Sequence, residues 1–105
     1  MHLFSDVVAR LNSKPGTPLT KSVYKDDTYT VSVNVSECIR MIYFVNSHNY
    51  EPVELLICRY KNQNCTVSKV FGGSSNNYLE TSIDGDHVIF TFRSGGVITL
   101  TSNIK

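Results

Sequence analysis

The chain of 105 residues suits one domain and is too short to form two comfortably. Its formal net charge of +1 argues against a protein that binds nucleic acid through a concentrated basic surface. Ala9 is the only alanine, whereas valine, serine, threonine and asparagine are abundant, and this composition favours strands and turns over helices. We therefore predict a single, mainly β domain.

The first predicted element is a short helix over residues 3–12. Ser5 is a natural N-cap for it, and one face of the helix is apolar. That face is formed by Leu3, Val7, Val8 and Leu11. Residues 13–18 are predicted to form a linker, and residues 19–105 to form an antiparallel β core.

Two strands are predicted at the start of the core. Residues 19–25 are expected to form an edge strand. Residues 28–35 alternate between apolar and polar side chains, as a half-buried antiparallel strand does. A three-residue connection over 36–38 would pair this strand with the following one and place Val33 beside Met41.

The apolar segments 38–45 and 53–60 are each compatible with a strand or with a short helix. Their β-branched and aromatic residues favour strands, although the apolar spacing of the first and Pro52 before the second suit a helix. In a strand, Arg40 shares a face with Ile42. Because burying an unpaired guanidinium is costly, we expect that face to be open to solvent or Arg40 to have an acidic partner.

Residues 78–101 predict a meander of three strands. Asp84-Gly85 is typical of a two-residue hairpin turn, and residues 94–96 would close a second hairpin that places Phe92 opposite Ile98. One side of the meander is then apolar, and we expect it to form the hydrophobic core. Its residues are Leu79, Ile83, Val88, Phe90, Phe92, Ile98 and Leu100.

A further strand over 65–71 and two exposed loops, over 46–52 and 72–77, complete the prediction. The fold class that we predict is mainly β. It counts as α+β only because of the short N-terminal helix. The architecture is an antiparallel sandwich or partly open barrel of about seven strands that ends in the three-stranded meander, with the helix over one end or edge.

The sequence also predicts a cellular location. Asp6 and Arg10 interrupt what would have to be the apolar part of a secretory signal, and the longest apolar run, Met41–Val45, is too short to cross a bilayer. We therefore predict a cytoplasmic location, which is the host cytoplasm if the protein is viral. In that compartment we expect reduced thiols that act as small apolar residues. The three cysteines are Cys38, Cys58 and Cys65.

A thiol beside a histidine is the sharpest candidate for catalysis, and it would combine one of the cysteines with His48 or His87. Nothing in the sequence places such a pair in the open, electropositive setting that a nucleophile needs. Asp84, Asp86 and His87 are possible metal ligands, but their spacing is that of a hairpin turn rather than of a metal loop. We assign no catalytic, cofactor-binding or metal-binding residue and expect no cofactor.

Recognition of another protein is the function that we favour. Tyrosine is the most frequent aromatic residue of the chain, and it is enriched at protein interfaces. Our hypothesis is a small non-catalytic protein-interaction domain of an accessory, inhibitor or immunity type, such as a virus or phage encodes. It would act through a sheet face or edge and through loops 46–52 and 72–77. The partner-binding residues that we predict are His48, Tyr50, Tyr60, Lys61 and Tyr78.

The expected partner is a protein of unknown identity. A homo-oligomer is a second expectation, because small sheets leave unpaired edges. Nucleic acid and membranes are not expected partners. Two alternative functions stay open at this point, which are a cysteine-dependent enzyme that uses a Cys/His pair and a small-molecule-binding β-barrel.

Overall fold

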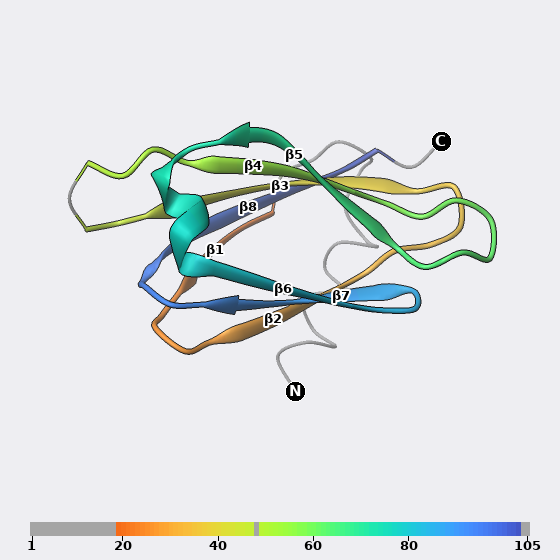
Figure 1. Cartoon of the computed structure of the whole chain (residues 1–105), viewed down its shortest axis with the longest axis horizontal. Coiled ribbons are helices and arrows are strands. Elements are labelled where there is room, and N and C mark those ends of the chain that lie inside the picture. The colour runs from red at the N-terminus through yellow and green to blue at the C-terminus, as the bar shows by residue number, and fades with distance from the viewer. Residues whose placement is uncertain (1–18, 48, 104–105) are drawn as a thin grey trace.

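The computed structural model describes residues 19–47 and 49–103, which form eight β-strands and one short 3-10 helix (Figure 1). The strands are β1 (Leu19–Val23), β2 (Thr28–Ser32), β3 (Cys38–Val45), β4 (Val53–Cys58), β5 (Thr66–Gly72), β6 (Leu79–Asp84), β7 (His87–Phe92) and β8 (Gly96–Asn103). The 3-10 helix, η1, spans Ser74–Tyr78. The predicted helix over 3–12 and the linker over 13–18 lie outside the described residues. Within the described ranges, no helix is long and apolar enough to cross a membrane.

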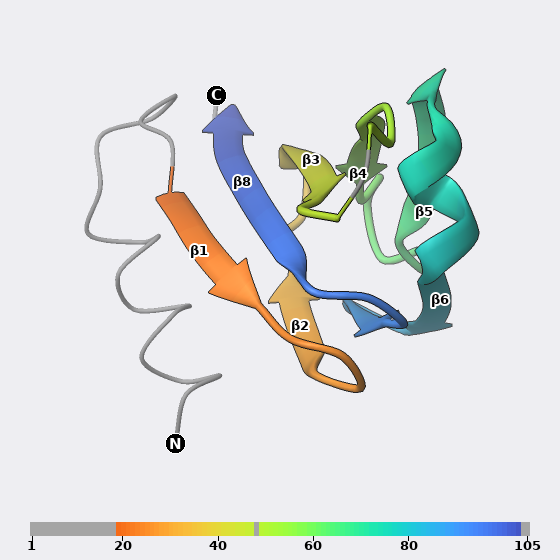
Figure 2. The same ribbon diagram turned by 90° about the vertical axis from the view of Figure 1, so that its left-hand side faces the viewer.

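The eight strands form two antiparallel sheets that pack face to face (Figures 1 and 2). The larger sheet has five strands in the order β1-β8-β3-β4-β5, and the smaller sheet has three in the order β2-β7-β6. The prediction of a mainly β, antiparallel sandwich is therefore confirmed, and the described strands do not close into a barrel. β1 is an edge strand, as predicted, and both segments that were compatible with a helix, now β3 and β4, are strands.

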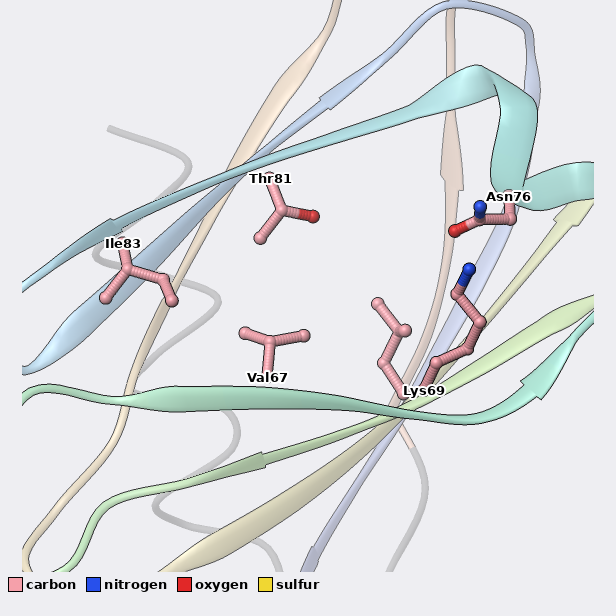
Figure 3. A pocket seen from close by; sticks show the side chains of 6 residues that line it. Val67, Lys69, Asn76, Thr81 and Ile83 are labelled. Atoms are coloured by element: carbon pink, nitrogen blue, oxygen red, sulfur yellow. The ribbon is translucent and has the colours of Figure 1, made fainter.

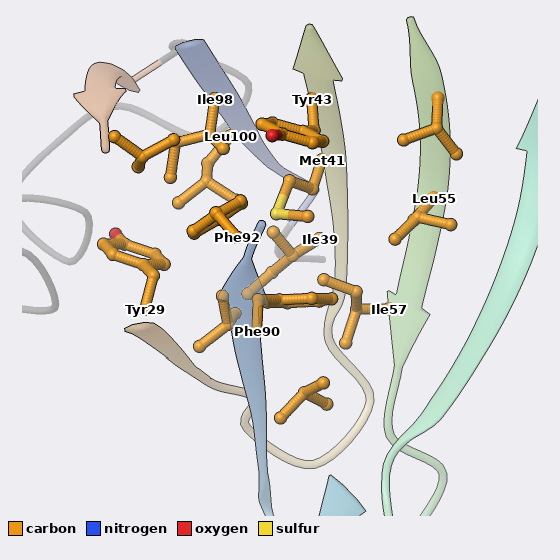
Figure 4. Close-up of a cluster of buried hydrophobic side chains, with 14 of the residues drawn as sticks. Tyr29, Ile39, Met41, Tyr43, Leu55, Ile57, Phe90, Phe92, Ile98 and Leu100 are labelled. Atoms are coloured by element: carbon orange, nitrogen blue, oxygen red, sulfur yellow. The ribbon is translucent and has the colours of Figure 1, made fainter. Parts of the chain in front are cut away.

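The hydrophobic core lies between the two sheets (Figure 4). In β3 and β4 every second side chain is buried and the intervening ones point outward, which is the pattern of strands with one buried face. Phe90 and Phe92 of β7 are fully buried, as predicted, and they belong to the same cluster as Ile98 and Leu100 of β8. Among the predicted core residues Ile83 is the exception, because it is 46% exposed.

The predicted three-stranded meander is wrong in its last strand. β6 and β7 form the expected hairpin, but β8 crosses to the other sheet, where it pairs with β1 and β3. Phe92 therefore pairs with Leu79, and Ile98 pairs with Tyr43. Two strands with apolar faces can lie side by side in one sheet or face each other across a sandwich. Alternation alone does not distinguish the two arrangements.

The predicted pairing of residues 28–35 with 38–45 is wrong for the same reason. β2 pairs with β7, whereas β3 lies between β4 and β8 in the opposite sheet. The β2–β3 connection is held by the buried Glu37, whose carboxylate accepts a hydrogen bond from the Asn34 N–H at 2.9 Å. The Glu37 carbonyl accepts a second one from the Arg59 N–H at 3.1 Å, and this bond ties the connection to the end of β4.

The β6–β7 turn is displaced by one residue from its predicted position. Asp84 pairs with His87, so the two turn residues are Gly85 and Asp86. Gly85 has a φ of +60°, and a glycine in the first of two turn positions is what a type II′ hairpin requires. The prediction is right that this glycine makes the turn and wrong about its place in it.

The prediction of three reduced cysteines is wrong for two of them. Cys38 and Cys58 lie directly opposite each other on β3 and β4 and form a disulfide. Their Cα atoms are 4.2 Å apart, which is close to the separation that antiparallel neighbours have at non-hydrogen-bonded pairs. Cys65 has a free thiol and is buried, as expected for a small apolar residue.

Replacement of Gly96, at the start of β8, tests how closely β8 packs against β3. A Cβ at this position would lie 2.2 Å from the Phe44 carbonyl oxygen, so Gly96→Ala must displace backbone. We expect it to lower the free energy of unfolding by about 1–3 kcal/mol. Gly95→Ala is the matched control, because a Cβ there meets the Val23 carbonyl oxygen at 3.7 Å, an ordinary contact. Urea unfolding measures both variants, and equal effects would contradict the packing.

Reduction of the disulfide is expected to destabilise the domain. The bond closes a loop with a sequence separation of 20, for which loop-closure entropy gives about 3 kcal/mol. We expect a reductant to lower the free energy of unfolding of the wild type, and of a Cys65→Ala control, by about this amount. A variant that combines Cys38→Ser with Cys58→Ser should not respond to the reductant.

A thiol count gives the independent check on the disulfide. Alkylation of the unfolded but unreduced chain should label Cys65 alone. Labelling of Cys38 and Cys58 without prior reduction would show that the bond is absent.

Candidate functional site

Two of the predicted binding residues, Tyr50 and Tyr78, meet at one end of the sandwich. The Tyr78 hydroxyl donates a hydrogen bond to the Tyr50 hydroxyl at 2.7 Å, and the two rings pack edge to face with centroids 5.0 Å apart. The hydrogen bond to Tyr50 is the main reason why the pKa of Tyr78 is raised, because it favours the protonated form. Both rings are partly buried and pack against the core, so much of their surface is used within the molecule.

The two predicted loops lie against each other at this end. The Ser75 N–H donates to the Glu51 carbonyl at 2.8 Å, and the Glu51 N–H donates to the Ser74 hydroxyl at 2.9 Å. Ser75 is buried, and its hydroxyl accepts a hydrogen bond at 3.2 Å from the last N–H of β3. Segment 72–77, which the sequence predicts to be an exposed loop, therefore contains most of η1 and is anchored on segment 46–52.

Tyr60 and Lys61 lie at the opposite end, in the β4–β5 turn (Figure 1). Tyr60 is 63% exposed, and the Lys61 Nζ lies 5.2 Å from the centroid of its ring. This turn contacts the β6–β7 turn, because the Cys65 N–H donates to the Gly85 carbonyl at 2.8 Å. His48 lies outside the described residues. The predicted binding residues that are described thus form two groups rather than one site.

A cleft runs along one side of the sandwich, between the edge strands β5 and β6 (Figure 3). Its volume is about 410 Å³, which is within the range of ligand-binding pockets. Side chains from the two sheets point toward one another across it. The residues that line it, and that define the β5–β6 cleft, are Leu55, Val67, Lys69, Asn76, Thr81 and Ile83.

The cleft is consistent with the unequal width of the two sheets. A sheet of three strands cannot cover the whole inner face of a sheet of five, because each strand is about 4.8 Å wide. At this edge Val67 faces Thr81 and Ile83 (Figure 3), whereas large rings such as Phe90 and Tyr43 fill the centre of the sandwich. The space between the edge strands is therefore only partly filled.

β5 and β6 differ as edge strands. Among the described strands each pairs with one neighbour only, so one row of backbone groups in each has no partner strand there. The register between β4 and β5 shifts between Glu54 and Leu55, which leaves Val70 as an extra residue in β5. The pairing of β6 with β7 is regular along its whole length. Exposed apolar side chains occur on both strands, and they are Val70, Phe71 and Ile83.

Lys69 is the only charged residue of the six that line the cleft. The stem of its side chain lies on Gly72, where a Cβ would come within 2.7 Å of the Lys69 Cδ. Its ammonium group lies beside the Asn76 amide in Figure 3, and within residues 19–47 and 49–103 it makes no ion pair or hydrogen bond. The cleft thus combines an apolar lining with one cation that has no counter-ion in the described part of the chain. The only sequence signal for Lys69 itself is a charged residue at an inward-facing position of a predicted strand.

His87 contacts two carboxylates at the β6–β7 turn. Its Nε2 lies 3.3 Å from Asp84 Oδ2, and its Nδ1 lies 3.2 Å from Asp86 Oδ1. The hydrogen bond with His87 is the main reason why the pKa of Asp86 is lowered. These are the three residues that the sequence indicates as possible metal ligands. Among the described residues, however, no group of three His, Cys, Asp or Glu side chains is arranged to hold a metal ion.

The one free thiol is poorly suited to catalysis. The disulfide removes Cys38 and Cys58 as nucleophiles, and burial raises the pKa of Cys65, so that its thiolate is disfavoured at neutral pH. No family model matches the chain, and no curated protein and no solved structure matches it.

Replacement of His87 by alanine is expected to raise the pKa of Asp86. The contact with His87 holds the pKa of Asp86 below its ordinary value of 3.8. The contact therefore stabilises the fold at pH values above 3.8, and this stabilisation is lost as the pH falls through the lowered pKa. An NMR titration of the Asp86 carboxyl carbon should show its midpoint move up toward 3.8. An unchanged Asp86 midpoint would contradict the contact.

Proposed function

We propose that this protein is a small non-catalytic interaction domain that binds an extended segment of a partner protein in the β5–β6 cleft. The observation that supports this function most directly is that one free edge of each sheet borders the same partly apolar cavity. Extended peptides bind to sheets at such edges, where main-chain hydrogen bonds give affinity and pockets for alternate side chains give specificity.

β6 is the strand to which we assign the added segment. Its regular pairing with β7 leaves a straight free edge, whereas the bulge at Val70 interrupts the edge of β5. Bulges of this kind protect an edge from further pairing. A segment paired with β6 would direct every second side chain toward the cleft, next to Thr81 and Ile83. A cavity of about 410 Å³ has room for a large apolar side chain.

Lys69 adds a preference for an acidic partner. Because its ammonium group has no counter-ion among the described residues, a carboxylate in the cleft would gain a charge-assisted hydrogen bond from it. The amide of Asn76, beside it in Figure 3, is a second donor. The expected ligand is therefore an extended segment with apolar side chains at alternate positions and an acidic residue among them.

Selection from a phage-displayed library of random linear peptides tests this function on the immobilised full chain. We expect enrichment of the pattern just described, and loss of binding to the Thr81→Arg variant, which places a long charged side chain in the cleft. Thr20→Arg is the matched control, because Thr20 is exposed on β1, at the far edge of the larger sheet. Failure of the selection, or equal binding by both variants, would contradict the function.

The same peptides test the role of the lysine. Lys69→Glu should weaken the binding of an acidic peptide by about tenfold, as the loss of one charge-assisted hydrogen bond implies, and fluorescence anisotropy measures the change. Lys25→Glu is the control, since Lys25 is exposed in the β1–β2 turn and the change in net charge is the same. Equal weakening by both variants would show that the effect is not local.

A small molecule is the competing ligand for a cavity of this volume. Native mass spectrometry of the freshly purified chain separates the two cases. A retained compound that is lost in the Thr81→Arg variant would make the cleft a small-molecule site and would overturn the peptide-binding function.

A further inference from the structure

The outer face of the five-stranded sheet carries a group of apolar side chains among polar ones, although the solvated face of an antiparallel sheet is usually polar. The outward positions of β3, β4 and β8 alternate with the buried ones, and Phe71 of β5 shares their side because it pairs with Glu54. Phe44 and Phe71 are 41% and 49% exposed. The outer-face patch consists of Ile42, Phe44, Leu56, Phe71 and Val97.

The outer-face patch has members on four neighbouring strands. Phe44 pairs with Val97 of β8, and Ile42 lies two residues away on the same side of β3. Paired residues on neighbouring strands, and their diagonal neighbours, are within reach of one another. A group of apolar side chains gathered on one sheet face indicates an interaction site.

Arg40 and Glu54 carry the only charges at outward-facing positions of the described strands of this sheet. Glu54 is the acidic partner that the sequence predicts for Arg40, but Arg40 Nη1 is 3.8 Å from Glu54 Oε2, beyond hydrogen-bonding distance. The side chains are 48% and 26% exposed. Both groups therefore retain capacity for a further partner, and the face has one charge of each sign.

We propose that a second copy of this chain binds the outer-face patch, so that the protein forms a two-fold symmetric dimer through its five-stranded sheet. In such an interface one surface meets itself, so each charge must find its opposite on the same surface. Arg40 pairs with Leu56, and Ile42 pairs with Glu54. These four residues form a rectangle on the outer face, in which the two charged residues occupy one diagonal and the two apolar residues the other. A two-fold axis along the Ile42–Leu56 diagonal places Arg40 against Glu54 of the partner subunit and stacks the apolar corners on their counterparts.

The area of the sheet is sufficient for such a dimer. The five strands have 5, 8, 8, 6 and 7 residues, and at about 3.3 Å per residue and about 4.8 Å between strands they present roughly 540 Å² of flat area. Two copies would bury about 1,100 Å², which is above the roughly 1,000 Å² that a biological interface should bury. A purely apolar partner would leave Arg40 and Glu54 desolvated without new partners, which is costly, and this favours a second copy.

Exchange of the two charges tests the dimer by sedimentation velocity of the full chain at micromolar concentrations. Arg40→Glu makes the face doubly acidic, and Glu54→Arg makes it doubly basic. Each variant alone should dimerise at least about a hundredfold more weakly than the wild type, because like charges then meet across the interface. An equimolar mixture of the two should form a heterodimer. Both substitutions in one chain should restore the homodimer, which also shows that the substitutions permit folding.

Two results would overturn this dimer. A wild type that stays monomeric throughout would show that the patch is free or is covered by something other than a second copy. Single variants that dimerise as tightly as the wild type would show that another surface is used. Thr81→Arg, in the β5–β6 cleft, should leave the dimer intact, so a failure of this proposal is distinct from a failure of peptide binding.

Discussion

Tyr43 holds the two sheets of this protein together at the point where the chain crosses between them. Its ring centroid lies 4.9 Å from that of Phe92, the last residue of β7, and its hydroxyl donates a hydrogen bond to the Ser94 carbonyl at 2.7 Å. Burial raises the pKa of Tyr43, which keeps the phenol protonated as a donor. One side chain of the larger sheet thus fixes both the end of β7 and the connection to β8. Loss of a buried aromatic ring costs about 3–5 kcal/mol, against a typical total stability of about 5–15 kcal/mol.

The positions of the strands followed from the sequence, but their neighbours did not. The alternation in residues 28–35 predicts that Tyr29, Val31 and Val33 point to one buried face, and all three are buried. This alternation does not predict which strand is the neighbour. Val31 pairs with Val88, but any other apolar residue could occupy the same place beside it. The Cys38–Cys58 disulfide depends on the same missing information, since it requires β3 and β4 to be paired in one register.

The candidate site, too, could be predicted from the sequence only in part. The sequence singles out Tyr50 and Tyr78 as partner-binding residues, and this stays a prediction, whereas in the structure the two side chains contact each other. The β5–β6 cleft is invisible in the sequence, because its existence depends on which strands lie at the sheet edges. The cytoplasmic location stays a prediction. The disulfide weighs against it, because such bonds persist mainly in oxidising compartments and cytosolic thiol systems reduce them.

The exposure of the cleft residues has a consequence for how the protein can change over time. Lys69, Thr81 and Ile83 are all exposed, and substitutions at exposed positions outside special contacts usually alter stability by about 0.5 kcal/mol or less. Mutations at these positions can therefore change the surface of the cleft while the buried rings keep the fold intact. The ligand specificity that we propose for the cleft would then be able to evolve separately from folding.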